Sequence, residues 1–152
     1  MCGLRPRRMT ALAGVLLAVF FAVPAAALEF RSVGVNAAIT YDAPSAKANK
    51  LFILGKGYPV ELLVTLQGWY KVRDAAGELV WIEAKDLSQT RTLMVKVDRA
   101  DVRAAPEDDA PVVFQAQKDV LLDFLDLSGA FAHVRHSDGA TGYIRVNQVW
   151  GL

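Results

Sequence analysis

The sequence of 152 residues matches itself without a gap when it is shifted by 62 positions. The pairs that carry identical residues include Val33 and Val95, Val35 and Val97, Ala43-Pro44 and Ala105-Pro106, Val72-Arg73 and Val134-Arg135, Gly77 and Gly139, and Ile82 and Ile144. A period of about 60 residues indicates two small domains in series rather than one medium-sized core. We therefore predict a duplicated fold unit that occupies residues 28–88 and again residues 93–152.

The N-terminal segment, residues 1–27, has the pattern of a secretory signal peptide. Three arginines precede an apolar run of 14 residues, Thr10–Val23, and small residues follow it. A membrane-spanning helix needs about 20 apolar residues, so we expect no membrane span after cleavage near Ala27. The mature chain is then periplasmic or secreted and begins near Leu28. The alternative is an uncleaved anchor, because only Pro24 interrupts the run.

The only cysteine, Cys2, lies inside the predicted signal peptide, so the mature chain has no thiol. This excludes a disulfide framework, a zinc-thiolate site and a cysteine nucleophile. Each half has the size at which a lone domain buries only roughly 60% of its unfolded surface. The connector Ser88–Thr92 contains no proline or glycine that would make it a free linker. We therefore expect the halves to share an interface near this connector.

Loss of the signal peptide changes the charge balance. The mature chain keeps fourteen basic residues against 16 acidic ones, which gives a formal net charge of about −2. A protein that binds nucleic acid needs a clustered basic face that neutralises phosphates. Here Lys47, Lys50 and Lys56 are spaced among apolar residues, so no nucleic-acid partner is expected.

Apolar residues alternate with other residues in both halves, and this period of two predicts β-strands. The alternating positions are Val33 and Val35, Val60, Leu62 and Val64, Tyr70 and Val72, Val80 and Ile82, and in the second half Val95 and Val97, Leu122 and Phe124, Ala132 and Val134, Gly142 and Ile144. Turns with glycine separate the runs. Five short strands per half would close as a small barrel, and closure removes exposed sheet edges. The predicted fold class is all-β, with two tandem small barrels after the signal peptide.

Four segments of this pattern resemble one known family. They are Asp101-Val102-Arg103-Ala104-Ala105-Pro106, Gly68-Trp69-Tyr70-Lys71-Val72-Arg73, Val80-Trp81-Ile82 and Gly142-Tyr143-Ile144. They are similar to the bacterial Src-homology-3-like (SH3b) family, whose pattern has a valine-arginine-x-x-proline segment, a glycine-tryptophan turn and a glycine-tryptophan-valine strand. The resemblance covers most of residues 31–152 and implies two SH3-like barrels, as in exported two-repeat proteins. It implies the fold more directly than the function.

In that family the loop after the proline and the glycine-tryptophan turn flank a shallow groove. The resemblance places Trp69 and Trp81 near this groove in the first repeat, and Phe131 and Tyr143 in the second. Two positions depart from the pattern, since Thr40-Tyr41-Asp42 replaces valine-arginine and Phe131 replaces tryptophan. The departures allow one repeat to bind while the other supports it.

Strand alternation gives a separate argument for the outward-facing residues. If Tyr70 and Val72 face the core, then Trp69, Lys71 and Arg73 face the opposite side of the same strand. Together with the resemblance, this yields a set of candidate ligand-binding residues. The set is Trp69, Lys71, Arg73, Trp81, Phe131 and Tyr143.

The tryptophans also have purely structural readings, because tryptophan is mostly buried in folded proteins. Trp69 could cap the barrel or fill the interface between the repeats, and Trp81 fits either role. Trp150 lies two residues from the end of the sequence. We expect it to pin the C-terminal segment to the second barrel.

No catalytic set can be assembled from the mature residues. The only histidines, His133 and His136, are expected to point to different faces, so a joint metal site would need ligands from elsewhere. The acidic run Glu107-Asp108-Asp109 lacks the glycine and the ligand spacing of a calcium loop. No serine lies in a glycine-flanked elbow. We expect no enzyme activity, no metal and no cofactor.

Two functions from different classes remain. In the first, the protein is a non-enzymatic binding module whose groove holds cell-wall peptide or glycan. The aromatic candidates would then supply stacking surfaces, and Lys71 and Arg73 would meet carboxylates. The SH3b resemblance favours this function, because related domains often accompany wall-cutting enzymes. In the second, the protein is a periplasmic adaptor, and an exposed strand or loop of one barrel docks a partner protein of the envelope.

Overall fold

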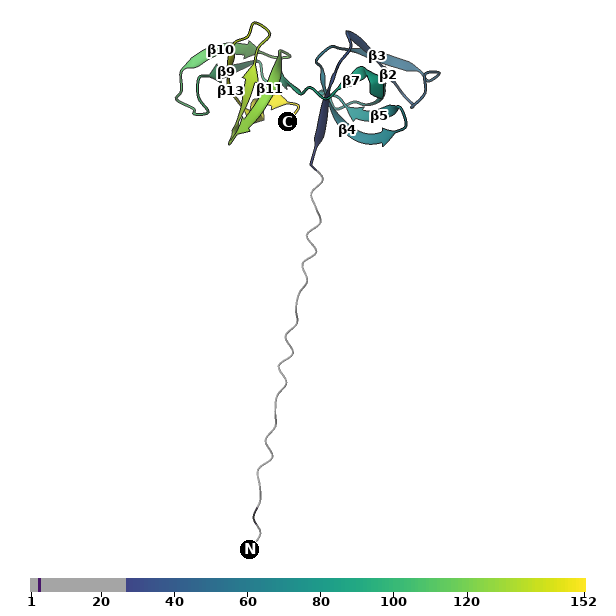
Figure 1. The fold of residues 1–152 in the computed structure, drawn as a ribbon, viewed down its shortest axis with the longest axis horizontal. Coiled ribbons are helices and arrows are strands. Elements are labelled where there is room, and N and C mark those ends of the chain that lie inside the picture. The colour runs from purple at the N-terminus through teal and green to yellow at the C-terminus, as the bar shows by residue number, and fades with distance from the viewer. Residues whose placement is uncertain (1–2, 4–26) are drawn as a thin grey trace.

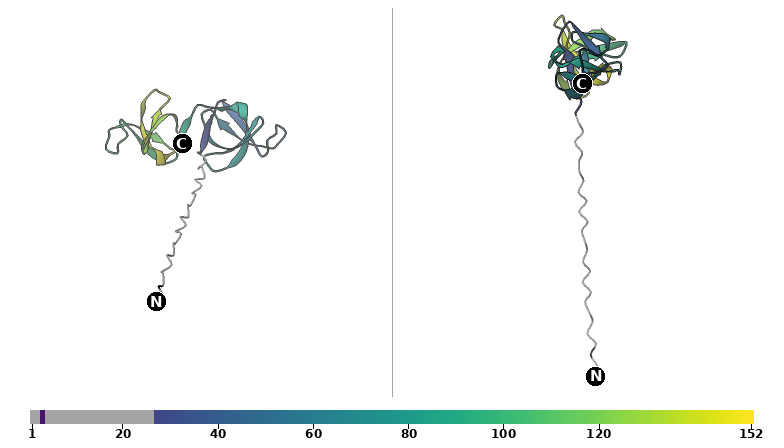
Figure 2. Two further views of the ribbon diagram at one scale, coloured as in Figure 1. Left: turned by 60° about the horizontal axis from the view of Figure 1, so that its bottom comes forward. Right: turned by 90° about the vertical axis from the view of Figure 1, so that its right-hand side faces the viewer.

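The computed structural model describes residue 3 and residues 27–152, so the predicted signal peptide lies outside the described residues apart from Gly3 and Ala27. The described chain forms two antiparallel sheets of seven strands, and each half adds one short 3-10 helix. Figures 1 and 2 show the sheets as two curled units that lie side by side and are joined by a short connector. The all-β fold with two tandem units is confirmed.

The first unit follows the strand order β3-β2-β6-β5-β4-β1-β7. Its elements are β1 (Glu29–Val33), β2 (Ala37–Tyr41), β3 (Lys50–Gly55), β4 (Pro59–Leu66), β5 (Trp69–Arg73), β6 (Leu79–Glu83), the 3-10 helix η1 (Ala84–Asp86) and β7 (Leu87–Ser88). The turn between β5 and β6 contains Gly77 at a φ of 91°. This left-handed conformation favours glycine, because glycine has no Cβ that would clash.

The second unit repeats this order as β10-β9-β13-β12-β11-β8-β14. Its elements are β8 (Thr92–Val95), β9 (Arg99–Arg103), β10 (Val112–Gln117), β11 (Leu121–Ser128), β12 (Phe131–Arg135), β13 (Thr141–Arg145), the 3-10 helix η2 (Val146–Gln148) and β14 (Val149–Trp150). Gly139, which matches Gly77 under the 62-residue shift, has a φ of 93°. The turn chemistry is therefore duplicated together with the strands.

Each unit has its own hydrophobic core, built from the inward-facing members of the alternation. In the first unit the buried cluster is Val33, Ala38, Leu54, Val60, Val72, Val80 and Ile82. In the second it is Leu93, Val95, Ala100, Val102, Ala116, Leu122, Ala132, Val134, Ile144 and Val149. Six of the seven first-unit positions match a member of the second-unit cluster under the shift, so one alternation pattern builds both cores.

The predicted fold class of two small barrels is confirmed, but the number of strands differs. Each half has seven strands instead of the expected five, and the strand order leaves β3 and β10 at an edge. The reason is the hairpin of β2 and β3. Strand β2 joins β6 through only two residue pairs, Thr40 with Ile82 and Tyr41 with Trp81, and within the described chain β3 pairs with β2 alone. Strand β3 is thus left at the outside of the first unit, as β10 is in the second.

The two units contact each other around the connector, as the sequence predicted. The Ser32 hydroxyl of β1 donates a hydrogen bond to the Thr90 carbonyl at 2.5 Å. The Thr92 hydroxyl, at the start of β8, donates to the Gly57 carbonyl of the first unit. These two bonds attach Thr90 and Thr92 of the connector to the first unit.

Aromatic rings and one arginine fill the joint between the units. Phe30 of β1 packs edge-on against Trp150 of β14, with ring centroids 5.2 Å apart. The Trp150 backbone pairs with Met94 of the second unit, as expected, but its ring also reaches the first unit. The Arg91 guanidinium lies 5.9 Å from the Phe30 ring centre and 5.0 Å from that of Phe124. Burial in this joint lowers the pKa of Arg91.

Replacing Phe30 with alanine should uncouple the units, because it removes the ring that joins β1 to Trp150. Truncation of a buried phenylalanine lowers the free energy of unfolding by about 3–5 kcal/mol. We expect a loss near the lower end of this range, because the hydrogen bonds around the connector remain. Calorimetry should then resolve two unfolding transitions in place of one. The control, Leu66→Ala at an exposed position, should change stability by less than about 0.5 kcal/mol. An unchanged melting curve for Phe30→Ala would contradict this role of Phe30 in joining the units.

Candidate functional site

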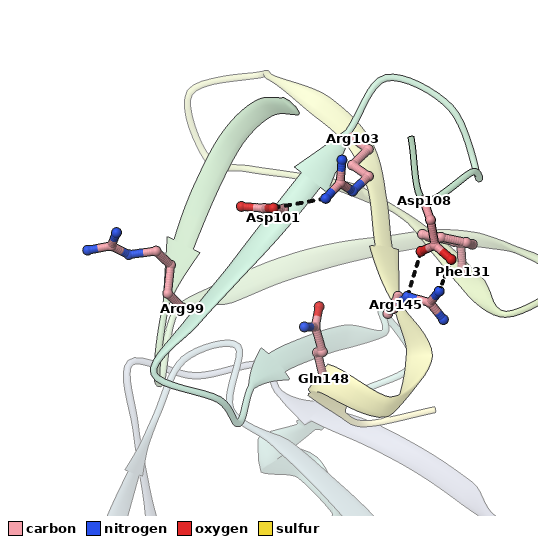
Figure 3. Close-up of a pocket in the computed structure, with 7 residues that line it drawn as sticks. All are labelled: Arg99, Asp101, Arg103, Asp108, Phe131, Arg145 and Gln148. Atoms are coloured by element: carbon pink, nitrogen blue, oxygen red, sulfur yellow. Dashed lines mark hydrogen bonds and ion pairs between the residues drawn. The ribbon is translucent and has the colours of Figure 1, made fainter. Parts of the chain in front are cut away.

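A cavity of about 220 Å³ opens on the outer face of the second unit (Figure 3). It is lined by Arg99, Asp101, Arg103, Asp108, Phe131, Arg145 and Gln148. These residues come from β9, the loop after β9, the start of β12, the end of β13 and η2. Segments far apart in the sequence thus meet at one place, where five charged side chains and one aromatic ring line the same cavity.

Strand β9 supplies three of the charged residues. Alternation places Arg99, Asp101 and Arg103 on the same face of this strand. Arg103 donates to the Asp101 carboxylate at 3.0 Å and to the Ala110 carbonyl at 2.8 Å. The other oxygen of Asp101 accepts a hydrogen bond from the Gln115 amide at 2.8 Å. The Arg103 guanidinium is therefore held in position and ties the loop of residues 104–111 to the sheet.

A second ion pair covers the aromatic ring. Arg145 of β13 pairs with Phe131 of β12 across the ladder, and its guanidinium carbon lies 5.2 Å from the ring centre. Nε of Arg145 donates to one oxygen of Asp108 at 2.8 Å, and Nη2 donates to the other oxygen. This two-point contact fixes the plane of the guanidinium above the ring. The Phe131 side chain is left only 6% exposed.

The third arginine differs from the other two. Within residues 27–152 the Arg99 side chain forms no ion pair, and Figure 3 shows it pointing away from the two paired arginines. The lining therefore carries three guanidinium groups against two carboxylates. Arginine presents five N–H donors in a planar fork that matches a carboxylate. The chemistry that this cavity suits is the binding of an anionic group, with Gln148 as a further hydrogen-bonding side chain.

The matching face of the first unit carries aromatic rings. Tyr41 of β2 packs edge-on against Trp69 of β5, with ring centroids 5.2 Å apart. Trp81 of β6 lies opposite both Tyr41 and Lys71 in the ladders. Arg73 forms an ion pair with the buried Glu61 carboxylate at 2.7 Å. This face, formed by Tyr41, Trp69, Lys71 and Trp81, is called the aromatic face below.

The same positions thus hold different chemistry in the two units. Under the 62-residue shift Tyr41 becomes Arg103, and Trp69 becomes Phe131. A family model for the bacterial SH3 domain matches residues 34–89 and again residues 96–151. The chain belongs to the bacterial SH3 domain family. The domains of this family are non-catalytic binding modules, and the protein contains two of them in tandem.

Three solved structures have a partial similarity to this chain. The chain is 18% identical to NlpC2 from Trichomonas vaginalis, with a TM-score of 0.39, over 83% of this chain and 49% of that one. The chain is 17% identical to NlpC1 from the same organism, with a TM-score of 0.39, over 91% of this chain and 51% of that one. It is 16% identical to an NlpC/P60 family protein from Bacillus cereus, with a TM-score of 0.37, over 80% of this chain and 56% of that one. The SH3 protein spans about half the length of these chains. No curated protein matched the sequence.

Two further properties concern the described part of the SH3 protein. None of its helices has the length and apolar character needed to cross a bilayer. Its histidine and acidic side chains nowhere gather in a group of three or more that could hold a metal ion. His133 stacks on Tyr143 at 4.6 Å between ring centroids, and His136 lies 3.1 Å from Asp138 in the following turn.

The sequence-predicted residues divide between the two SH3 units. Trp69 and Lys71 lie on the side of the sheet that alternation predicted, and Trp81, whose role the sequence left open, shares this aromatic face with them. Arg73 is on the same face but is already paired with Glu61.

In the second unit Phe131 lines the cavity but is only 6% exposed, with the Arg145 guanidinium 5.2 Å from its ring centre. Tyr143 lies on the outer face with one side stacked on His133. Their roles in ligand binding stay predictions.

The sequence reasoning missed the charged lining of the cavity. Arg103 occurs in the sequence-based prediction only as part of the family pattern, and Arg99 and Arg145 are not among the candidate residues. The repeat itself held a signal, since the shift aligns Arg145 with Glu83 and Asp108 with Ala46. Charge differences at matched outer positions of a duplicated fold mark where the two copies have diverged chemically.

Gly142 sets how closely β13 approaches β9 beside the cavity. A Cβ at this position would lie 2.7 Å from both the Arg103 carbonyl oxygen and Cγ1 of Val102. We expect Gly142→Ala to lower the free energy of unfolding by about 1–3 kcal/mol, the usual cost of overpacking. Urea unfolding measures the change. Thr141→Ala, at the exposed neighbour, is the control, and equal stability of the two variants would contradict this account.

Proposed function

We propose that this SH3 protein is an exported, non-enzymatic module that binds the peptide part of the cell wall in the bacterial envelope. The observation that carries the proposal is the arginine-lined cavity of the second unit. Wall peptides carry free carboxylates, and a carboxylate is the group that guanidinium forks hold best. The predicted signal peptide supports export to the compartment where such peptides occur.

Two of the arginines are positioned before any ligand arrives. Asp101 holds Arg103, and Asp108 holds Arg145 above Phe131. Donors that are already fixed lose little conformational entropy on binding, which favours affinity. Arg99 has no ion-pair partner within residues 27–152 and would supply the uncompensated positive charge. The apolar part of the peptide would lie along the stems of these side chains.

The aromatic face of the first unit supplies a second contact in this proposal. Trp69 and Trp81 present flat surfaces on which sugar rings or apolar peptide groups stack, and Lys71 adds a positive charge beside them. The two units are joined through Phe30 and Trp150, so both sites belong to one body. Linked sites on a repetitive polymer bind more tightly than either site alone.

The arginine cavity is tested by Arg99→Ala in a sedimentation assay with isolated peptidoglycan sacculi. Hydrogen bonds to charged groups contribute about 1.5–3 kcal/mol, so the apparent affinity should fall roughly tenfold or more. Arg135→Ala is the matched control, because it removes the same charge from an exposed position of β12 outside the cavity. Equal losses in the two variants would mean that only overall charge matters and would contradict the proposal.

The aromatic face is tested by Trp69→Ala in the same assay. We expect weaker sedimentation at a temperature where the variant is folded, and Trp69→Phe should retain most of the binding because it keeps a ring against Tyr41. Full binding by Trp69→Ala would remove the first unit from the proposal. If the wild-type protein does not sediment with sacculi, the wall assignment fails and the adaptor function becomes the better explanation.

A further inference from the structure

The outer edge strands, β3 and β10, contribute no residue to the lining of the cavity or to the aromatic face. Each ends its sheet, and within the described chain each pairs with one neighbour only, β2 or β9. The free side of such a strand presents backbone N–H and C=O groups to solvent and can template a further strand. Proteins commonly protect these edges with charged or proline residues along the strand. Neither strand is protected in this way over its middle residues.

Both edges expose apolar side chains instead. On β3, Leu51 is 48% exposed and Ile53 is 63% exposed. Ile53 faces Ile39 across the ladder, and these residues border a shallow depression of about 390 Å³ with Phe52 and Lys50. On β10, Val112 and Val113 are 45% and 49% exposed. Apolar residues on a free edge mark a surface that gains stability when another strand covers it.

The charges around the two edges are opposite in sign. The segment 42–57, which contains β3, has three lysines and one aspartate, a net charge of +2. The equivalent segment 104–119, which contains β10, has one lysine against four acidic residues, a net charge of −3. Two copies of β3 would repel each other, and so would two copies of β10. A β3 edge and a β10 edge, in contrast, attract each other.

The position of the edges decides what such a pairing builds. Strand β3 lies in the first unit and β10 in the second, toward opposite ends of the molecule in Figure 1. One molecule therefore offers the basic edge at one end and the acidic edge at the other. A contact between unlike surfaces is heterologous, and it leaves a free edge at each end of every dimer.

We propose that β3 of one copy pairs with the β10 edge of a second copy, so that the protein assembles head to tail. The occupant of each edge is a strand of this same chain, chosen by apolar cover and by opposite charge. This assembly goes beyond the proposed wall binding and does not depend on it. A row of copies would present many cavities to a polymeric ligand at once.

Two variants test the pairing, each of which places on one edge a charge of the opposite sign to that edge. Ile53→Glu blocks the basic β3 edge, and Val113→Lys blocks the acidic β10 edge. Sedimentation equilibrium of the purified protein should give a mass that rises with concentration beyond two copies for the wild type. Each variant alone should stay monomeric. An equimolar mixture of the two variants should form dimers and no larger species, because each partner keeps the edge that the other lacks.

The control is Val64→Lys, which adds the same charge as Val113→Lys at an exposed apolar position of β4, an interior strand, and should associate like the wild type. If Ile53→Glu or Val113→Lys fails to fold, Leu51→Glu or Val112→Lys carries the same test. A wild-type protein that is monomeric at every concentration overturns the proposal. A mixture that stays monomeric overturns it too, as does association that survives both edge variants, because the contact would then lie elsewhere.

Discussion

The antiparallel pairing of two neighbouring strands sets the faces of each unit. Strand β5 pairs with β6, and β12 pairs with β13, through five matched residue pairs in each case. Residues that face each other across such a ladder share one side of the sheet, so Lys71 and Trp81 lie together on the outer face. The same rule places Arg145 opposite Phe131, which brings a guanidinium group over an aromatic ring.

Duplication of this frame left the cores alike and let the outer faces diverge. Core positions are constrained by volume, because an interior packed at crystal density tolerates few changes of shape. Outer positions carry no such constraint. Tyr41 in one unit and Arg103 in the other therefore occupy equivalent places. The first unit has an aromatic face where the second has a charged cavity. The edges β3 and β10 diverged in charge in the same way.

The contact between the two units compensates for their small size. Units of this length bury a modest share of their surface and gain from a neighbour. The connector is short, and Arg91 between the Phe30 and Phe124 rings holds the units in contact. Because burial also lowers the pKa of Arg91, the joint costs desolvation as well as providing contact. The charged cavity and the aromatic face are therefore carried by two units that are in contact.

The sequence by itself determined the repeat, the all-β class and the outward direction of Trp69 and Lys71, because alternation and turn glycines act over a few neighbouring residues. It could not determine the cavity. The contact of Arg145 with Asp108 joins residues 37 positions apart, and the burial of Phe131 follows from that contact. Only the tertiary structure decided these features, because the curl of the sheet and the path of the loop after β9 depend on all the packing contacts together.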